Sequence, residues 1–121
     1  MTTIVTLEKL PKVSLNQLYA GIHWTKRKQQ KDNWTWIVRS QFKGLFPKSK
    51  QYNVEYEFFW KKSPLDASNC LYSAKMIEDT IFEDDKHDII LSVLVKSRKG
   101  THDYVKITVN EVILVEQKQL F

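Results

Sequence analysis

The chain has 121 residues and a mass of 14.4 kDa, which suits one domain and excludes a two-domain enzyme. Hydrophobic residues make up 42% and charged residues 27%, so the composition supports a folded core rather than disorder. The 19 Lys and Arg exceed the 14 Asp and Glu, and this net charge of +5 favours a polyanionic partner, above all nucleic acid. Cys70 is the one cysteine, which excludes an intramolecular disulfide and a cysteine-based zinc site. No apolar run reaches the length of a membrane span, so we expect a soluble cytoplasmic protein with no membrane partner.

The first half of the chain predicts a strand and then a helix. Residues 3–7 are rich in β-branched side chains and predict a strand that ends before Pro11. From residue 25 to residue 42 there is no Gly or Pro, and apolar side chains recur four positions apart, which predicts a helix ending near Gly44. The apolar positions on this face are Trp34, Val38 and Phe42.

The start of this helix is strongly basic. Between residues 26 and 50, eight basic residues oppose the single acid Asp32. We expect the first half to project into solvent as a basic arm that contacts phosphates, although a merely solvated helical face is the alternative. The arm consists of Lys26, Arg27, Lys28 and Lys31. Trp36 lies opposite the apolar face, where we favour a subunit interface or the core over stacking on a base.

The second half predicts a strand, a helix and two further strands. Apolar residues alternate with Glu from Val54 to Trp60, as in a half-buried strand. Residues 69–82 have helical spacing, with Ser68 or Asn69 available as the N-cap. Residues 89–95 form an apolar run typical of a central strand, and with residues 104–109, which residues 111–116 can extend, they predict a hairpin. The order β-α-β-α-β-β over residues 1–121 predicts one α+β domain, a small mixed sheet with helices on one face.

Acidic residues gather around the second helix and before the apolar run. Asp66 precedes that helix, Asp79 lies near its end, and Asp84, Asp85 and Asp88 follow it. Adjacent carboxylates beside a buried strand repel one another, and a divalent cation would relieve this repulsion. Mg²⁺ is often held by one or two carboxylates together with substrate phosphates. The alternative is a solvated turn, with Asp66 placed favourably at a helix N-terminus.

Several other side chains have the functional groups that catalysis or metal binding requires. Lys75 lies one turn before Asp79, where it is either a cation that contacts a scissile phosphate or half of an ordinary surface ion pair. Three histidines have no metal-binding spacing and are expected at the surface: His23, His87 and His102. Cys70 has no obvious partner and is expected to be a small buried residue. The chain has no Gly-rich phosphate loop, so we expect no nucleotide cofactor.

Three blocks of sequence follow one another along the chain. The first is residues 13–21, Val-Ser-Leu-Asn-Gln-Leu-Tyr-Ala-Gly, followed by Trp24, Arg27 and Lys31. The second is Leu-Asp-Ala-Ser-Asn at residues 65–69 with Lys-Met-Ile-Glu-Asp at residues 75–79. The third is the pair Asp84 and Asp85, which precedes the apolar run. Together the blocks cover roughly residues 13 to 115, and in this order they resemble the RusA family of phage-type Holliday junction resolvases.

The resemblance implies a structure-selective endodeoxyribonuclease, from a bacterium or its phage, that resolves branched DNA by paired nicks. It implies that Asp66, Asp84 and Asp85 hold Mg²⁺ or Mn²⁺, with Asp66, Lys75 and Asp85 in catalytic roles. Asn69 and Asp79 would support the site. Asn16 and Tyr19 would join the basic arm in contacting DNA, and paired nicks imply a homodimer.

One departure leaves a rival open. Family members often have Asp-x-Asp-Asn, whereas Ser68 stands here where the second carboxylate would be. A non-catalytic protein that binds branched DNA after losing a metal ligand is therefore the alternative. A small protein-interaction module with a Lys-rich helix is a third reading.

Overall fold

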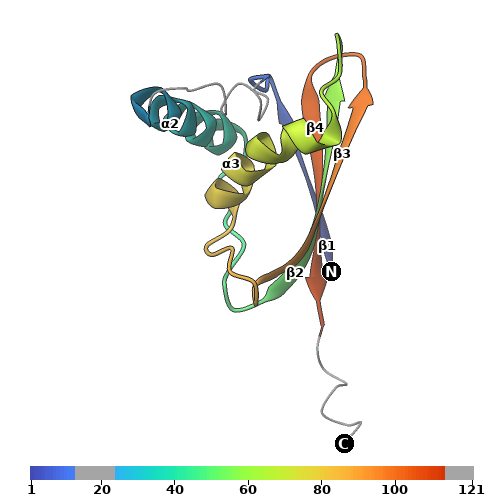
Figure 1. Cartoon of the computed structure of the whole chain (residues 1–121). Coiled ribbons are helices and arrows are strands. Elements are labelled where there is room, and N and C mark those ends of the chain that lie inside the picture. Colours follow the sequence, from blue (N-terminus) through green and yellow to red (C-terminus); the bar gives the residue numbers. More distant parts are fainter. Residues whose placement is uncertain (13–23, 114–121) are drawn as a thin grey trace, which may run out of the picture.

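The computed structural model of the chain describes residues 1–12 and 24–113, and it contains a four-stranded sheet with helices on one of its faces (Figure 1). This arrangement confirms the predicted α+β class and element order. The elements in chain order are β1 (Thr2–Glu8), α2 (Trp24–Gln41), β2 (Gln51–Trp60), the 3₁₀ helix η1 (Ala67–Cys70), α3 (Leu71–Ile81), β3 (Ile90–Lys99) and β4 (Tyr104–Val112). No helix within these described ranges is long and apolar enough to cross a membrane.

The sheet is mixed, with the strand order β1-β4-β2-β3. β4 pairs antiparallel with both β1 and β2, while β3 pairs in parallel with β2. The predicted hairpin of residues 89–109 is therefore wrong, because β2 lies between β3 and β4. The prediction paired the two strands because they are adjacent in the chain. In the structure each of them pairs instead with a different edge of β2.

The loop from β3 to β4 passes over the end of β2 and depends on a glycine. The backbone N–H of Gly100 donates a hydrogen bond of 2.9 Å to the carbonyl of Trp60, which ends β2. A Cβ atom at Gly100 would lie 2.8 Å from the Cβ atom of Phe59. The close approach explains why this crossing uses glycine, since any side chain would force the loop away from β2.

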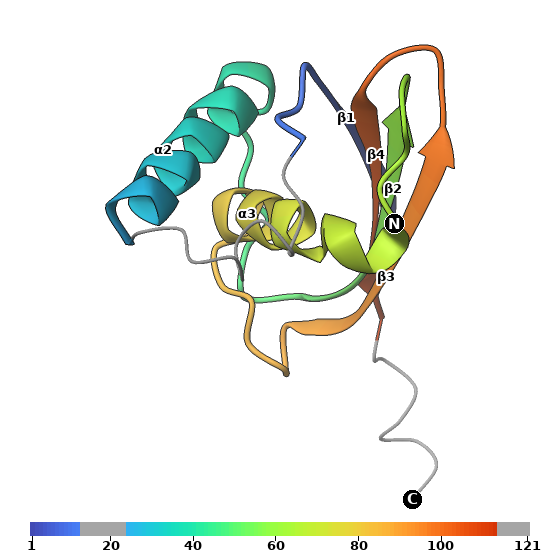
Figure 2. The same cartoon turned by 45° about the horizontal axis from the view of Figure 1, so that its top comes forward.

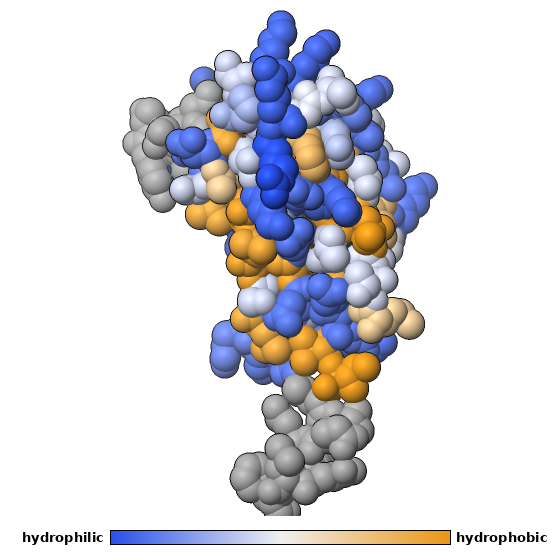
Figure 3. Space-filling view, turned by 90° about the vertical axis from the view of Figure 1, so that its right-hand side faces the viewer, coloured by the Kyte–Doolittle hydropathy of each residue, from blue (hydrophilic) through white to orange (hydrophobic). Residues whose placement is uncertain are grey.

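β3 is an edge strand and not the central strand that its composition predicts. Leu91, Val93 and Leu94 are each roughly half exposed. Figure 3, which views the molecule from the side away from the helices, shows apolar groups scattered between hydrophilic ones. A run of apolar residues can form either an edge strand or a central strand, and its length and composition do not distinguish the two positions.

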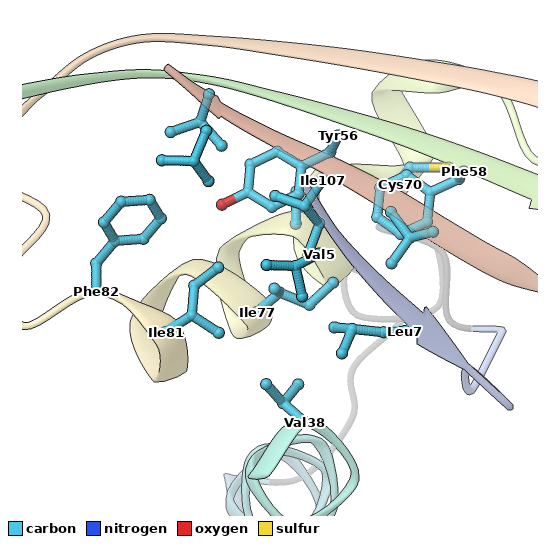
Figure 4. Close-up of a cluster of buried hydrophobic side chains, with 14 of the residues drawn as sticks. Val5, Leu7, Val38, Tyr56, Phe58, Cys70, Ile77, Ile81, Phe82 and Ile107 are labelled. Atoms are coloured by element: carbon cyan, nitrogen blue, oxygen red, sulfur yellow. The ribbon is translucent and has the colours of Figure 1, made fainter. Parts of the chain in front are cut away.

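The core lies between the sheet and the helices. The alternating residues of β2 point inward, and Tyr56, Phe58 and Trp60 are fully buried, which confirms the predicted alternation. Figure 4 shows Tyr56 and Phe58 on the sheet side of Ile77 and Ile81 of α3, with Val38 of α2 on the far side of that layer. Burying each such large apolar side chain contributes about 2 kcal/mol, so this layer fixes α3 against β2.

The start of α3 differs from the prediction. The α-helix begins at Leu71 after the 3₁₀ turn, and its N-cap residue Cys70 makes no side-chain capping bond. The predicted cap by Ser68 or Asn69 is therefore wrong. Backbone bonding replaces it, because the N–H of Asn69 donates to the carbonyl of Asp66 at 2.9 Å. The thiol of Cys70 is buried, as predicted.

Candidate functional site

The candidate site is centred on Lys75, an exposed residue in the middle of α3. Its ammonium lies 3.1 Å from a carboxylate oxygen of Asp79, one helical turn further along. It also donates a short hydrogen bond to Asp85, which follows the helix. The predicted shared face of Lys75 and Asp79 is confirmed, and the structure adds Asp85 to it. Two carboxylates from different parts of the chain thus converge on one cation at the surface.

A buried carboxylate lies behind this cluster. Glu78 of α3 is only 9% exposed, and its Oε1 atom accepts a hydrogen bond of 3.1 Å from the hydroxyl of Tyr56. Figure 4 shows Tyr56 reaching from β2 into the layer between the sheet and α3. Burial penalises the charged form of Glu78 more than the Tyr56 hydrogen bond and the nearby Lys75 favour it, so a charged Glu78 has an unfavourable place in the fold. We term the set Lys75, Glu78, Asp79 and Asp85 the Lys75 cluster.

The electrostatics of the Lys75 cluster favour the charged forms of Lys75 and Asp85. The hydrogen bond from Lys75 lowers the pKa of Asp85, against the opposing effect of partial burial. Partial burial by itself would lower the pKa of Lys75, but hydrogen bonds to Asp85 and Asp79 outweigh it and raise that pKa. Burial raises the pKa of Glu78, although the hydrogen bond from Tyr56 acts in the other direction. Burial and the nearby Glu78 also raise the pKa of Tyr56 well above its usual value.

The other predicted acidic residues lie outside the cluster. Asp84 is adjacent to Asp85 in the chain, but its Oδ1 atom accepts a hydrogen bond of 3.3 Å from the backbone N–H of Lys86. Asp66 precedes η1, so the 3₁₀ turn and the first turn of α3 lie between it and Lys75. Asp66 and Asn69 form no ion pair with the Lys75 cluster in the described structure.

The cluster offers a minimal set of ligands for a divalent cation. Within the described ranges, no group of three or more His, Cys, Asp or Glu side chains is arranged to hold a metal ion. Asp79 and Asp85 nevertheless reach one common point, which Lys75 occupies. Mg²⁺ commonly takes one or two carboxylates and completes its shell with waters and substrate phosphates. This pair of carboxylates therefore fits such an ion, with the phosphates of a substrate supplying further oxygens.

The basic arm lies at the start of α2 and is exposed, as predicted. The side chains of Lys26, Arg27, Lys28 and Lys31 all face solvent. The predicted DNA contacts Asn16 and Tyr19, together with His23 and most of the first block of the resemblance, fall outside the described residues. His87 and His102 are exposed, in agreement with prediction.

Trp36 has a different environment from the one expected. Its side chain is 73% exposed on α2, so a place in the core is wrong for this residue. The reason is geometric, since Trp34 and Val38 occupy the inward face of α2 and Trp36 lies across the helix from them. A role at a subunit interface stays a prediction.

Two features of the site were missed in the sequence. Glu78 fits the helical pattern as one position among others, but an acid in an otherwise apolar set with Ile77 and Ile81 is the signal of an unusual buried carboxylate. The lysines at the end of the sheet come from separate segments, so no sequence pattern connects them. Comparison with models of known protein families finds no match to this chain, and comparison with curated proteins finds no significant similarity.

Proposed function

We propose that this protein is a metal-dependent endonuclease that cleaves branched DNA. The observation that carries the proposal is the convergence of Asp79 and Asp85 on Lys75 at the protein surface. An ordinary helical ion pair needs only Lys75 and Asp79, and the addition of Asp85 from beyond the helix creates a compact group of opposite charges. Such a group is suited to a phosphodiester, which needs both anionic ligands for a metal and a cation for the phosphate.

The proposed roles follow from the chemistry of each side chain. Asp85 and Asp79 would hold Mg²⁺ or Mn²⁺, and by resemblance Asp66 and Asp84 are further candidate ligands. The metal would supply activation of the attacking water and neutralisation of phosphate charge. Lys75 would donate to a phosphate oxygen as negative charge grows there in the transition state. The ionised state of Asp85, favoured by its lowered pKa, suits a ligand for a cation.

The substrate assignment rests on charge and on the resemblance. The exposed basic arm at the start of α2 would follow DNA phosphates, and binding should weaken steeply with salt as counterions are released. Resolution of a four-way junction needs two nicks, so the proposal includes a homodimer with one Lys75 cluster in each subunit.

The test is cleavage of a labelled synthetic four-way junction in Mg²⁺ or Mn²⁺, with linear duplex as the substrate control. We expect paired nicks from the wild-type protein and none from Asp85→Asn. Asp88→Asn is the matched control, because Asp88 is an exposed carboxylate three residues further along. Equal cleavage by Asp85→Asn would remove the proposed role of the Lys75 cluster.

A second candidate has its own observation. Ser68 stands in place of a carboxylate, and Asp66 lies at the opposite end of the helical run from Asp79 and Asp85. A protein with this arrangement could bind branched DNA without cutting it. Tight junction binding in EDTA, without cleavage when Mg²⁺ or Mn²⁺ is added, would favour this candidate over the endonuclease.

A further inference from the structure

Four lysines surround a hollow at the end of the sheet, away from the Lys75 cluster. The hollow has a volume of about 740 Å³, and we term it the lysine pocket. It lies where the segment after β1 meets the β3–β4 loop, at the upper end of the sheet in Figure 1. Its lining residues are Glu8, Lys9, Lys12, Lys61, Lys62, His102 and Asp103.

The two carboxylates of the lysine pocket already have partners. Glu8 lies 2.8 Å from the ring of His102, and Asp103 accepts a hydrogen bond of 2.8 Å from the backbone N–H of Lys61. Across the described residues, by contrast, the ammonium groups of Lys9, Lys61 and Lys62 form no ion pair. Four lysines against the two carboxylates of Glu8 and Asp103 leave the lysine pocket with a formal charge of +2, which attracts polyanions.

The backbone around the lysine pocket is held in an unusual conformation. Lys9 and Ser63 have φ angles of 56° and 40°, in the left-handed region that residues other than glycine seldom adopt. Lys12 ties these two segments together, because its ammonium donates to the carbonyls of Lys62 and Ser63 at 2.7 and 2.6 Å. Backbone strain of this kind costs energy and recurs at binding sites, where it fixes side chains in place.

A second hollow adjoins the lysine pocket and brings an aromatic side chain beside it. This hollow, of about 360 Å³, shares Glu8 and Lys9 with the lysine pocket and is walled by Trp36. Gln41 joins α2 to β1, since its side chain accepts from the Glu8 N–H at 2.6 Å and donates to the Glu8 carbonyl at 2.8 Å. Figure 2 shows the C-terminal part of α2 beside the segment after β1. Trp36 and Lys9 therefore line the same hollow.

We propose that the lysine pocket and Trp36 together bind a single strand of DNA, with the phosphates on the lysines and a base stacked on the indole. Uncompensated cations next to an exposed aromatic face form the usual platform for single strands. A duplex would engage the lysines alone, because its bases are stacked on one another and cannot cover Trp36. The choice of DNA over RNA rests on the proposed function, and the strand would be an unpaired segment of the branched substrate.

The experiment measures binding of a fluorescent 12-nucleotide thymidine strand by anisotropy in EDTA, so that no cleavage is involved. An abasic strand of equal length supplies the same phosphates without bases. The pocket variant is Lys9→Gln/Lys61→Gln/Lys62→Gln. The matched control, Lys48→Gln/Lys50→Gln/Lys86→Gln, removes three exposed charges that line neither hollow.

We expect the pocket variant to lose at least tenfold in affinity and the control variant less than threefold. The salt slope of the pocket variant should become shallower by about 2, since each phosphate contact to a single strand contributes about 0.7. Equal losses in the two variants would mean that only net charge matters, and would overturn the lysine pocket as a site.

Trp36→Ala tests the stacking. It should weaken binding of the thymidine strand about fivefold or more, and leave binding of the abasic strand unchanged. Loss on both strands, or on neither, would overturn the role of Trp36, while tenfold tighter binding of a uridine RNA strand would overturn the assignment to DNA. Strand binding is measured in EDTA and junction cleavage is measured separately with its own variant, so failed cleavage and failed strand binding are separate results.

Discussion

Replacing Lys75 by Met separates a catalytic cation from an ordinary surface ion pair. Met keeps much of the length of the side chain but removes the charge that Asp79 and Asp85 share. If Lys75 contacts the phosphate in the transition state, junction cleavage should fall by about 10²- to 10³-fold. Lys75→Arg, which keeps the charge, should retain more activity than Lys75→Met.

The expected cost in stability is small because the groups are exposed to solvent. The side chain of Lys75 is 53% exposed, and those of Asp79 and Asp85 are 28% and 31% exposed. Ion pairs with such exposure contribute about 0 to 1 kcal/mol each, so Lys75→Met should lower the free energy of unfolding by about 1 kcal/mol. For a domain of this size the midpoint of thermal unfolding would fall by about 4 °C. The pKa of Asp85 should rise toward its usual value, which NMR titration can follow.

Lys50→Met is the matched control for this prediction. Lys50 pairs with Glu111 at 3.4 Å, and the exposed fractions of 49% and 26% are close to those of Lys75 and Asp79. The control should lose similar stability and no cleavage. Equal cleavage by the two variants would show that Lys75 is only a surface ion pair. If Lys75→Met alone lowered the free energy of unfolding by more than about 3 kcal/mol, the main role of Lys75 would be in folding.

Three further predictions concern stability. Glu78→Gln keeps the acceptor for Tyr56 and removes a buried charge. Because the native pKa of Glu78 is raised, its contribution to stability is complete at low pH and is lost as the pH rises through that pKa. In denaturant unfolding the variant should therefore gain about 1 kcal/mol in the free energy of unfolding at pH 7 and nothing at pH 4. For Asp85 the native pKa is lowered, so its stabilising contribution is complete above the ordinary pKa of about 3.9 and is lost as the pH falls through the native pKa. Asp85→Asn should therefore flatten the acid side of a plot of the free energy of unfolding against pH. An unchanged plot would contradict the pairing with Lys75. Gly100→Ala should cost about 1 to 3 kcal/mol in chemical unfolding because its Cβ atom would meet Phe59, and a neutral result would show that the loop shifts freely.

Local patterns in the sequence predicted the elements, and their failures have a common cause. The alternation in β2 and the four-residue spacing of α2 depend only on which face meets a core, so they survive any arrangement of neighbours. The position of β3 depends instead on which strand edge is free when the chain folds. Within residues 89–100 only Gly100 is specific to the crossing over β2, and a turn in a hairpin would use a glycine equally well.

The candidate site shows the same division. The pairing of Lys75 with Asp79 follows from helical spacing alone, and sequence reasoning found it. The residues alone offered Asp85 or Asp84 together with Asp66 as a metal site, provided that the fold brings them together. The approach of Asp85 to Lys75 depends on the path of residues 82–89 after α3, which cannot be read from composition. The lysine pocket joins residues more than fifty positions apart in the chain, so neither pattern nor spacing could reveal it.

The charges of the two proposed sites differ in a way that suits one bound substrate. At the Lys75 cluster, one ammonium faces two exposed carboxylates, with Glu78 behind them, so this end of the protein attracts cations and repels bare phosphate. At the lysine pocket the four lysines outnumber the carboxylates of Glu8 and Asp103 by two, so phosphate would bind there without a metal. DNA would therefore be held first by the lysines and Trp36, and would reach the carboxylates only with a divalent ion to offset the repulsion. This order predicts that strand binding persists in EDTA while cleavage requires the metal, and that the two are abolished by different substitutions.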